Sequence, residues 1–458
     1  MGLYTSLVAN LLFPLQERLK NHNTVPIREA MDDSQWWPPE KLEQFRFERL
    51  RSLLVGAGKH VPYYRNCFAN LGFDPQAINA ITELQKLPFL TKTVIRVEGD
   101  SMKSDIAQGL ARFNTGGSSG EPLIFFIGNE RVGHDVAAKW RATRWWDVDI
   151  GDTEIVVWGS PIELGTQDRF RAIRDKFMRT ELMPAFQMSE PNLDQFVARI
   201  RERRPKMLFG YPSAISHIAA HAGKRGVQLN NLGVKVVFCT SERLYDCQRE
   251  TIITAFGCPV ANGYGGRDAG FIAHECPVGG MHITAEDIIV EIIDGQGNVQ
   301  PAGVSGEIVV THLATSEFPF IRYRTGDIGT LGAERCACGR GLPLLKEIQG
   351  RSTDFVIAAD GTIMHGLALI YVVRDLPEVQ SFKIVQESKQ LIRVMLAIKA
   401  DANRRYLSDV VTKGFRKRLG EEVQVDVEFP ESIPAERSGK FRYVISHVAQ
   451  PIDNFHNA

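Results

Sequence analysis

The chain has 458 residues, too many for one ordinary hydrophobic core, and this length predicts roughly two to four domains. Its 44% hydrophobic and 24% charged content is typical of a soluble globular protein. Fifty-four basic and 54 acidic residues cancel. No global field would therefore draw the chain to nucleic acid or to an anionic membrane.

The N-terminal stretch "MGLYTSLVANLLFPLQERLK" has a short apolar patch but no basic lead-in and no clear small-residue cleavage site. We expect a packing helix here and not a signal peptide. No uncharged apolar run approaches the ~20 residues that a bilayer-spanning helix needs. Seven cysteines, an odd number, argue against a purely disulfide framework and predict a reducing cytoplasm.

Residues 36–60 are predicted to be helical, because Leu42, Phe45, Leu50, Leu53 and Leu54 repeat near a period of 3.6. From about residue 150 onward, apolar strand-like runs alternate with amphipathic helical ones. The strand candidates in chain order are "TEIVVWG", "KMLFG", "VKVVFCT" and "PVANGYG". This alternation is typical of βαβ units around a mostly parallel sheet, so the predicted fold class is α/β.

The pattern changes after residue 282, where short strands are separated by turn residues. "DIIVEIID", "SGEIVVTHL" and "FPFIRYRTGDIGTL" predict a smaller β-rich subdomain. After a further break near 350, the order strand, strand, helix, strand predicts a small α+β domain. We therefore expect an N-terminal domain at residues 1–350 and a C-terminal domain at 351–458.

The stretch "FNTGGSSGEPLIFF" (113–126) places a glycine-rich loop ahead of a predicted strand. Glycines let successive N–H groups point inward as an anion-binding nest, and the hydroxyls of Thr115, Ser118 and Ser119 add donors. No Gly-Lys-Ser/Thr closes the loop, so it is not a Walker A motif, and it lacks the helix-opening context of a dinucleotide fingerprint. Taken alone, the loop fits a solvated turn as well as a phosphate site.

Three further stretches change that balance. "NGYGGRDAG" (262–270) ends a predicted strand, where α/β sheets build their sites, and "YRTGDIG" (323–329) places Asp327 in a tight turn. "SGKFR" (438–442) places Lys440 in a glycine turn. Each stretch alone would fit an ordinary turn or one solvated lysine among many.

Together these motifs resemble the adenylate-forming acyl ligases, and within them the phenylacetate–CoA ligase and CapK-like branch. "TGGSSGEP", "YGGRDAG", "YRTGDIG", "IQGRSTDF" and "ERSGKFR" occur in the order and at the spacing of that family, and the resemblance covers almost the whole chain. It implies a large adenylate-forming domain, built of βαβ sheets plus a β-rich subdomain, followed by a small mobile α+β lid domain.

The resemblance also implies roles for individual residues. Lys440 would reach the acyl carboxylate and the α-phosphate, and Asp268 would serve Mg²⁺. The ATP-binding residues would be Thr115, Gly116, Gly117, Ser118, Ser119, Gly120, Tyr264, Gly265, Asp327 and Arg351.

The sequence departs from the family pattern in two places. Arg267-Asp268 stands where Thr-Glu is commoner, and the shorter carboxylate would need a bridging water to reach Mg²⁺. The hinge acid expected after Arg351 is replaced by Thr353 with Asp354 next to it, so the hinge residue stays ambiguous.

Two glycine-rich turns, "ECPVGGMH" and "CACG", offer thiolate and imidazole ligands of the kind that tetrahedral zinc prefers. The alternative is that these are small, partly buried packing residues. Because the related branch carries a Cys/His cluster in these two places, we predict a structural Zn²⁺ held by Cys276, His282, Cys336 and Cys338. His274 is a substitute ligand.

The leading hypothesis is an enzyme that activates an aryl or other small organic acid with ATP and transfers it to coenzyme A. Trp158, Phe209, Tyr211 and Phe238 indicate an aromatic or apolar acyl group, although they also fit an ordinary core. A carrier protein, an amine or a sugar as acceptor stays open, as does a non-catalytic nucleotide-binding homologue. The expected partners are the carboxylic acid, ATP and CoA, without nucleic acid; a homodimer is left open.

Overall fold

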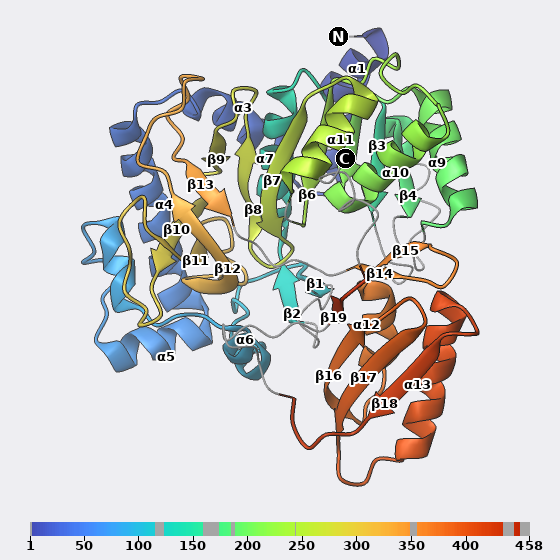
Figure 1. Ribbon diagram of the computed structural model, residues 1–458. Coiled ribbons are helices and arrows are strands. Elements are labelled where there is room, and N and C mark those ends of the chain that lie inside the picture. The colour runs from blue at the N-terminus through green and yellow to red at the C-terminus, as the bar shows by residue number, and fades with distance from the viewer. Residues whose placement is uncertain are drawn as a thin grey trace.

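The computed structural model describes residues 2–114, 123–158, 174–184, 188–242, 244–348, 355–433 and 444–448. A mixed α/β architecture with five sheets is present in these ranges, and Figure 1 shows a large N-terminal part above a smaller C-terminal domain. The predicted α/β fold class is confirmed. No helix within the described ranges combines the length and the apolar character that crossing a membrane requires.

Helices form the N-terminal region of the large part. They are α1 (Leu3–Leu7), the π-helical turn η1 (Val8–Leu12), α2 (Phe13–Leu19), α3 (Thr24–Ser34), α4 (Pro39–His60), α5 (Pro62–Leu71), the 3-10 helix η2 (Ile81–Lys86) and α6 (Lys92–Glu98). The helix predicted at 36–60 is confirmed as α4. Proline at N1 starts α4 and α5, a position where its missing N–H costs no hydrogen bond.

A seven-stranded sheet in the order β4-β3-β5-β6-β7-β8-β9 forms the centre of the large part. Its strands are β3 (Glu154–Trp158), β4 (Thr180–Pro184), β5 (Met207–Gly210), β6 (Val236–Thr240), β7 (Val260–Gly266), β8 (Gly270–Glu275) and β9 (Met281–Ile283). β4 through β7 pair in parallel, and β8 and β9 add antiparallel strands at one edge. The βαβ prediction is therefore correct.

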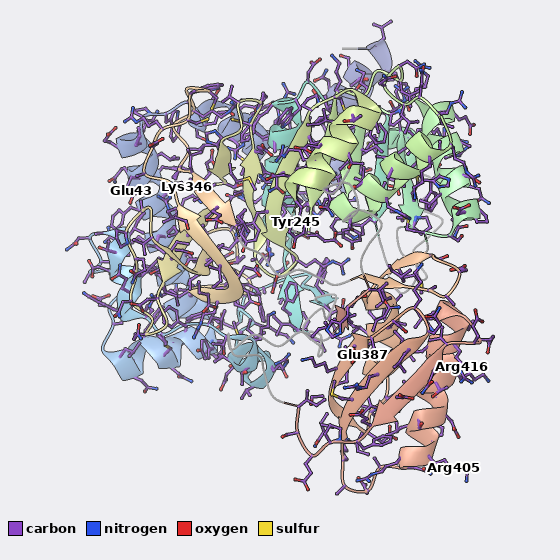
Figure 2. The ribbon with its side chains drawn as sticks, viewed as in Figure 1. Glu43, Tyr245, Lys346, Glu387, Arg405 and Arg416 are labelled. Atoms are coloured by element: carbon purple, nitrogen blue, oxygen red, sulfur yellow. The ribbon has the colours of Figure 1, made fainter. Side chains whose placement is uncertain are left out.

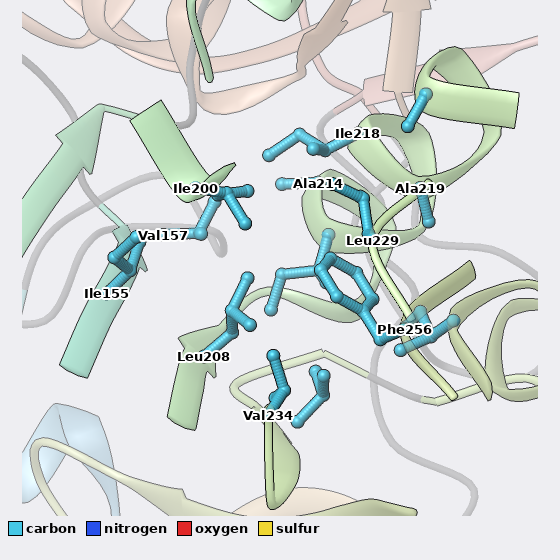
Figure 3. Packing of buried hydrophobic residues seen from close by; sticks show 14 of the residues in the cluster. Ile155, Val157, Ile200, Leu208, Ala214, Ile218, Ala219, Leu229, Val234 and Phe256 are labelled. Carbon is cyan, nitrogen blue, oxygen red and sulfur yellow. The ribbon is translucent and has the colours of Figure 1, made fainter. Parts of the chain in front are cut away.

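Helices cover both faces of this sheet. α9 (Glu190–Arg203), α10 (Pro212–Lys224) and α11 (Asp246–Phe256) pack on the face that carries Ile155, Val157 and Leu208 (Figure 3). α7 (Asn129–Arg144) packs on the opposite face, where Ala142 meets Phe209 and Phe238. Two-sided burial explains why the strands read as continuous apolar runs and not as alternating ones.

The predicted β-rich subdomain is an antiparallel sheet in the order β10-β11-β12-β13. Its strands are β10 (Ile288–Ile293), β11 (Ser305–His312), β12 (Tyr323–Leu331) and β13 (Leu345–Ile348). Tyr323 and Phe320 join its core to Phe125 of the two-stranded pair β1 (Ala111–Asn114) and β2 (Ile124–Ile127). This core places the start of β12 next to the β1–β2 pair.

The C-terminal domain has its own core around Phe382, Val394 and Phe415. It contains β14 (Phe355–Ile357), β15 (Ile363–His365), α12 (Leu367–Arg374), β16 (Val379–Gln386), β17 (Leu391–Ile398), α13 (Arg404–Leu419), β18 (Gln424–Glu428) and β19 (Val444–Ser446). The main sheet has the order β18-β17-β16-β19. Arg405 on α13 points away from this sheet, as an amphipathic helix requires (Figure 2). The small α+β domain is thus present, while its exact limit at 350/351 stays a prediction.

Candidate active site and metal centre

The turn between β7 and β8 brings the Tyr264 motif into position. Its two strands approach so closely that a Cβ on Gly265 would lie 2.3 Å from the Gly270 carbonyl oxygen. Gly270 itself has φ +80, which favours glycine, and a Cβ there would lie 2.7 Å from Nε2 of His312. Close backbone packing at Gly265 and the positive φ of Gly270 therefore explain two of the glycines around the turn that carries Asp268.

Two tyrosine–aspartate hydrogen bonds join this turn to β12. The Tyr264 hydroxyl donates to Oδ2 of Asp327 at 3.0 Å, and the Tyr323 hydroxyl donates to Oδ2 of Asp268 at 2.6 Å. Each motif thus supplies one phenol and one carboxylate to the other. The structure brings together Tyr264, Asp268 and Asp327, which the sequence analysis selected separately, and it adds Tyr323.

The backbone around Asp327 fixes the direction of its carboxylate. Gly326 has φ +79, and the Thr325 hydroxyl donates to the Ile308 carbonyl at 2.8 Å while accepting from the Asp327 N–H at 3.1 Å. Burial, followed by the charge of Asp327, raises the pKa of Tyr264 well above its ordinary value. Tyr264 therefore stays a protonated donor at neutral pH, and Asp327 stays the acceptor.

A network of charged side chains on α7 supports the turn. Arg131, in the first turn of α7 and 1% exposed, donates from Nη2 to the Arg267 carbonyl at 2.8 Å. Its Nε lies 3.4 Å from Oδ2 of Asp135. Its Nη1 is buried without a hydrogen-bond partner in the described part of the chain. Arg131 thus holds the peptide next to Asp268, a role that no sequence motif indicated.

His312 completes this network from β11. Its Nδ1 accepts from the Ala314 N–H at 3.3 Å, which leaves the proton on Nε2, 3.6 Å from Oδ1 of Asp135. Burial lowers the pKa of His312, so the ring is neutral. Arg131 and the His312 N–H therefore face the same carboxylate, which keeps the Asp135 charge compensated inside the protein.

The glycine-rich loop, Thr115–Gly120, lies outside the described residues, and so do Arg351, Thr353, Asp354 and Lys440. The strands on either side of the loop are described, however. Asn114 of β1 pairs with Ile124 of β2, and Nη1 of Arg267 lies 3.5 Å from the Asn114 carbonyl. Both ends of the loop are therefore held close together, and one of them contacts the turn that carries Asp268.

The four aromatic residues that the sequence analysis associated with an apolar acyl group lie together in the structure. Trp158 stacks on Tyr211 with 4.6 Å between ring centroids, and it stacks on Phe209 at 6.1 Å. Phe209 stacks on Phe238 at 5.7 Å. The four predicted pocket residues thus form one continuous row, with Trp158 and Tyr211 partly exposed at its end and Phe238 buried.

A cavity of about 280 Å³ lies beside α7, toward the amino ends of β3, β4 and β5. Its apolar wall includes Phe13, Trp140, Met178, Met207 and Phe271. An ion pair between Lys139 and Glu154, 3.0 Å long, also borders it. Lys139 connects the cavity wall to the aromatic row, because its Nζ lies 4.0 Å from the centroid of the Phe209 ring.

The four predicted metal ligands converge at one point. Their ligand atoms all lie within 4.8 Å of one another, with Cys276 and His282 buried and Cys336 and Cys338 partly exposed. Sγ of Cys276 lies 3.6 Å from Sγ of Cys336, and Nε2 of His282 lies 3.2 Å from Sγ of Cys338. Three thiols and one imidazole at these distances are a ligand set that would suit a tetrahedral zinc ion.

Surrounding groups orient these ligands. Nδ1 of His282 donates to the Leu342 carbonyl at 3.2 Å, which leaves Nε2 toward the cysteines, and burial lowers the pKa of the ring to about 4. Gly280 is required next to them, because a Cβ there would lie 2.4 Å from Sγ of Cys336. His274 lies outside the cluster and stacks on Phe271 at 5.4 Å, so the alternative ligand is not used.

Comparisons with known proteins agree with this architecture. Residues 356–447 match the CapK C-terminal domain. The chain is 24% identical to protein CapK from Staphylococcus aureus over 418 residues, which cover 89% of each chain. It is 25% identical over 442 residues to a phenylacetate-coenzyme A ligase from Thermus thermophilus, covering 89% of this chain and 97% of that one.

Among solved structures, the chain is similar to 2-hydroxyisobutyryl-CoA ligase in complex with 2-HIB-AMP and CoA. The TM-score is 0.65 and the identity 21%, with 93% of each chain covered. The fold is therefore that of the adenylate-forming acyl-CoA ligases. Within that class, the curated relatives confirm the predicted resemblance to CapK and the phenylacetate–CoA ligases.

The Asp327→Ala variant is predicted to weaken ATP binding at least about ten-fold, since one charge-assisted hydrogen bond contributes ~1.5–3 kcal/mol. Binding of the acid should change far less. Calorimetric titration with ATP measures the effect, and Asp401→Ala, which alters an exposed aspartate of the C-terminal domain, serves as control. An unchanged ATP affinity in Asp327→Ala would contradict this role.

The Arg131→Met variant is predicted to lose about 1–3 kcal/mol of unfolding free energy, because the half-buried Asp135 keeps only the His312 N–H as a partner and the Arg267 carbonyl loses its donor. Adding Asp135→Asn should recover part of the loss by removing that charge. Urea denaturation measures both variants. Arg225→Met breaks only exposed ion pairs and should cost less than about 1 kcal/mol. Additive losses in the double variant would contradict the coupling.

The protein is predicted to bind one zinc ion per chain, detected by elemental analysis after purification without chelator. Cys336→Ser should lower both the zinc content and the melting temperature, because a closed four-ligand site contributes directly to folding. Cys67→Ser, which changes a cysteine outside the cluster, is the matched control. Metal-free protein with unchanged thermal stability in Cys336→Ser would refute the site.

Proposed function

We propose that this chain is an AMP-forming acid–thiol ligase that activates an aryl or other small organic acid and transfers it to coenzyme A. The observation that carries the proposal is the pair of hydrogen bonds from Tyr264 to Asp327 and from Tyr323 to Asp268. They join an aromatic ring and two carboxylates around a turn whose Arg267 contacts Asn114, at one end of the glycine-rich loop. The similarity to phenylacetate-coenzyme A ligases supports the same reaction.

In the first half-reaction, a carboxylate oxygen of the acid attacks the α-phosphorus of ATP. The bond from that phosphorus to the bridging oxygen breaks, and pyrophosphate leaves. We assign the adenine to the Tyr264 ring and the ribose hydroxyls to Asp327. Thr115, Ser118, Ser119 and the N–H groups of Gly116, Gly117 and Gly120 would hold the phosphates, since such a loop can present several donors at once.

The Asp268 carboxylate suits Mg²⁺ on chemical grounds. Oδ2 of Asp268 accepts from the Tyr323 hydroxyl, and Oδ1 of Asp268 accepts from the Ala269 N–H at 3.1 Å. Each carboxylate oxygen has a second lone pair, so a hard cation can still be bound directly or through water. When bound, the ion neutralises phosphate charge. The chain's own contribution is the fixed direction of the Asp268 carboxylate.

In the second half-reaction, the thiol sulfur of coenzyme A attacks the acyl carbon, the bond from that carbon to the phosphate oxygen breaks, and AMP leaves. We propose that the C-terminal domain turns between the two steps, with Arg351 at the junction and Thr353 or Asp354 as the hinge.

The row from Trp158 to Phe238 favours an aryl or apolar acyl group. The three cysteines of the metal cluster suit a reducing cytoplasm.

Pyrophosphate exchange over a panel of carboxylic acids tests the proposed first step, and an acceptor screen after acyl-AMP formation tests the second. Exchange with an aryl acid, followed by thioester formation with CoA, is the expected result. An amine, a sugar or a carrier protein as the preferred acceptor would overturn the second step only. No exchange with any acid, in folded Mg²⁺-loaded protein, would favour a non-catalytic nucleotide-binding protein.

The Lys440→Ala variant is predicted to slow adenylation by ~100-fold or more, as loss of a transition-state charge partner commonly does. Thioester formation from supplied acyl-AMP should stay nearly unchanged, because a lysine used in one domain orientation serves one step. The two half-reactions are assayed separately, with Lys389→Ala as the control for an exposed lysine of the same domain. Equal losses in both steps would refute the assignment.

A further inference from the structure

An exposed row of leucines follows the N-terminal helical segment at every fourth residue. Leu3, Leu7, Leu11, Leu15 and Leu19 are 94%, 45%, 57%, 54% and 79% exposed. The opposite side is buried, where Phe13 packs edge-on against Trp140 of α7. Exposing five leucines to water is unfavourable. A contiguous exposed apolar surface of this kind indicates an interaction site.

The π-helical turn η1 helps to keep this row on one side. A four-residue repeat drifts around an α-helix, which has 3.6 residues per turn. η1 (Val8–Leu12) has wider i→i+5 turns, with more residues per turn than an α-helix. It therefore offsets this drift between Leu7 and Leu15 and keeps the leucines on one side. The segment from Leu3 to Leu19 is about 25 Å long at 1.5 Å per residue. Figure 1 shows α1 at the upper edge of the large part, beside the N label.

Residues 174–179 extend the apolar surface next to α1. The Tyr4 hydroxyl donates to the Phe177 carbonyl at 2.9 Å, and the Arg179 guanidinium lies 5.4 Å from the centroid of the Tyr4 ring. Phe177 is 57% exposed and Tyr4 is 39% exposed. An exposed lysine, Lys176, lies directly before Phe177. This neighbouring segment therefore adds aromatic rings and cations to the leucine row.

The exposed charges on the N-terminal segment have one sign. Between residues 2 and 22 the acidic residue is Glu17, which is 4% exposed and accepts from the Thr24 hydroxyl at 2.5 Å. Arg18 and Lys20 are exposed. In the neighbouring segment, the carboxylate of Asp175 is bound by Arg174 at 2.8 Å. Exposed cations thus flank both ends of the row, without an exposed carboxylate on the N-terminal segment.

We propose that the leucine row, together with Tyr4, Phe177 and the flanking cations, docks the protein on an anionic lipid bilayer. Leucines and aromatic rings would enter the boundary between headgroups and acyl chains, while lysine and arginine side chains reach the lipid phosphates. A second copy of the chain would bring the same cations against each other. An anionic surface supplies the opposite charge, and each nearby cation then strengthens binding.

Co-sedimentation of the full-length protein with vesicles tests this surface without any assay of activity. Vesicles of phosphatidylglycerol and phosphatidylcholine, 1:1, are compared with phosphatidylcholine alone. The unaltered protein should bind the anionic vesicles more tightly. The double change Leu11→Gln and Leu15→Gln should weaken binding ~10-fold or more, because two leucines leave the acyl boundary. Lys20→Glu and Lys176→Glu should each weaken it at least about five-fold.

Matched controls distinguish this surface from general stickiness. Val97→Gln and Ile106→Gln change exposed branched apolar side chains elsewhere, and Lys389→Glu reverses a charge in the C-terminal domain. All three variants should bind like the unaltered protein. Absence of binding to anionic vesicles would overturn the proposal. So would a dimer, measured by analytical ultracentrifugation, that the Leu11→Gln and Leu15→Gln changes dissociate, because the row would then be an interface between copies.

Discussion

Two phenol-to-carboxylate hydrogen bonds connect the parallel sheet of the large part to its antiparallel subdomain. Tyr264 belongs to β7 and Asp268 to the turn that follows it, whereas Tyr323 and Asp327 belong to β12. Since each bond has one partner in each sheet, neither carboxylate can be aimed correctly unless the two sheets keep their relative position. The rest of the candidate site therefore depends on how these two sheets are held together.

The protein holds them at two further points. Beside the turn, Arg131 and His312 converge on Asp135 next to Gly270, so a helix, a strand of each sheet and one half-buried carboxylate meet. Farther away, Cys276 and His282 lie at the β8–β9 edge, while Cys336 and Cys338 lie between β12 and β13. A metal bound there would tie the same two sheets together at their other end. The candidate active site and the Cys/His cluster thus share structural elements.

Removing a charge from water is unfavourable. This explains why the Asp135 carboxylate is faced by both the Arg131 guanidinium and the His312 N–H. An uncompensated ion inside a protein loses several kcal/mol of hydration, and paired ions recover it only with good geometry. Arg131, 1% exposed, has partners for Nη2 and Nε, but its Nη1 has none among the described residues. That unpaired donor belongs to the same guanidinium whose Nη2 supports the Asp268 turn.

Much of this architecture could be predicted from the sequence. Apolar runs and helical periods were enough to predict the βαβ order, the β-rich subdomain and the α+β domain, because local patterns reflect two-sided burial. The motif residues Tyr264, Asp268, Asp327 and the Cys/His cluster were found from spacing and family resemblance.

Only the tertiary structure revealed the roles of Arg131, Asp135, His312 and Tyr323. They come from elements far apart in the chain, and their partners are fixed by packing, which no local pattern encodes. The leucine row illustrates the same limit, because the sequence analysis predicted only a packing helix in this segment. Which side packs on Trp140 and which faces solvent was decided by the fold, because that depends on the surfaces that α7 and residues 174–179 present to it.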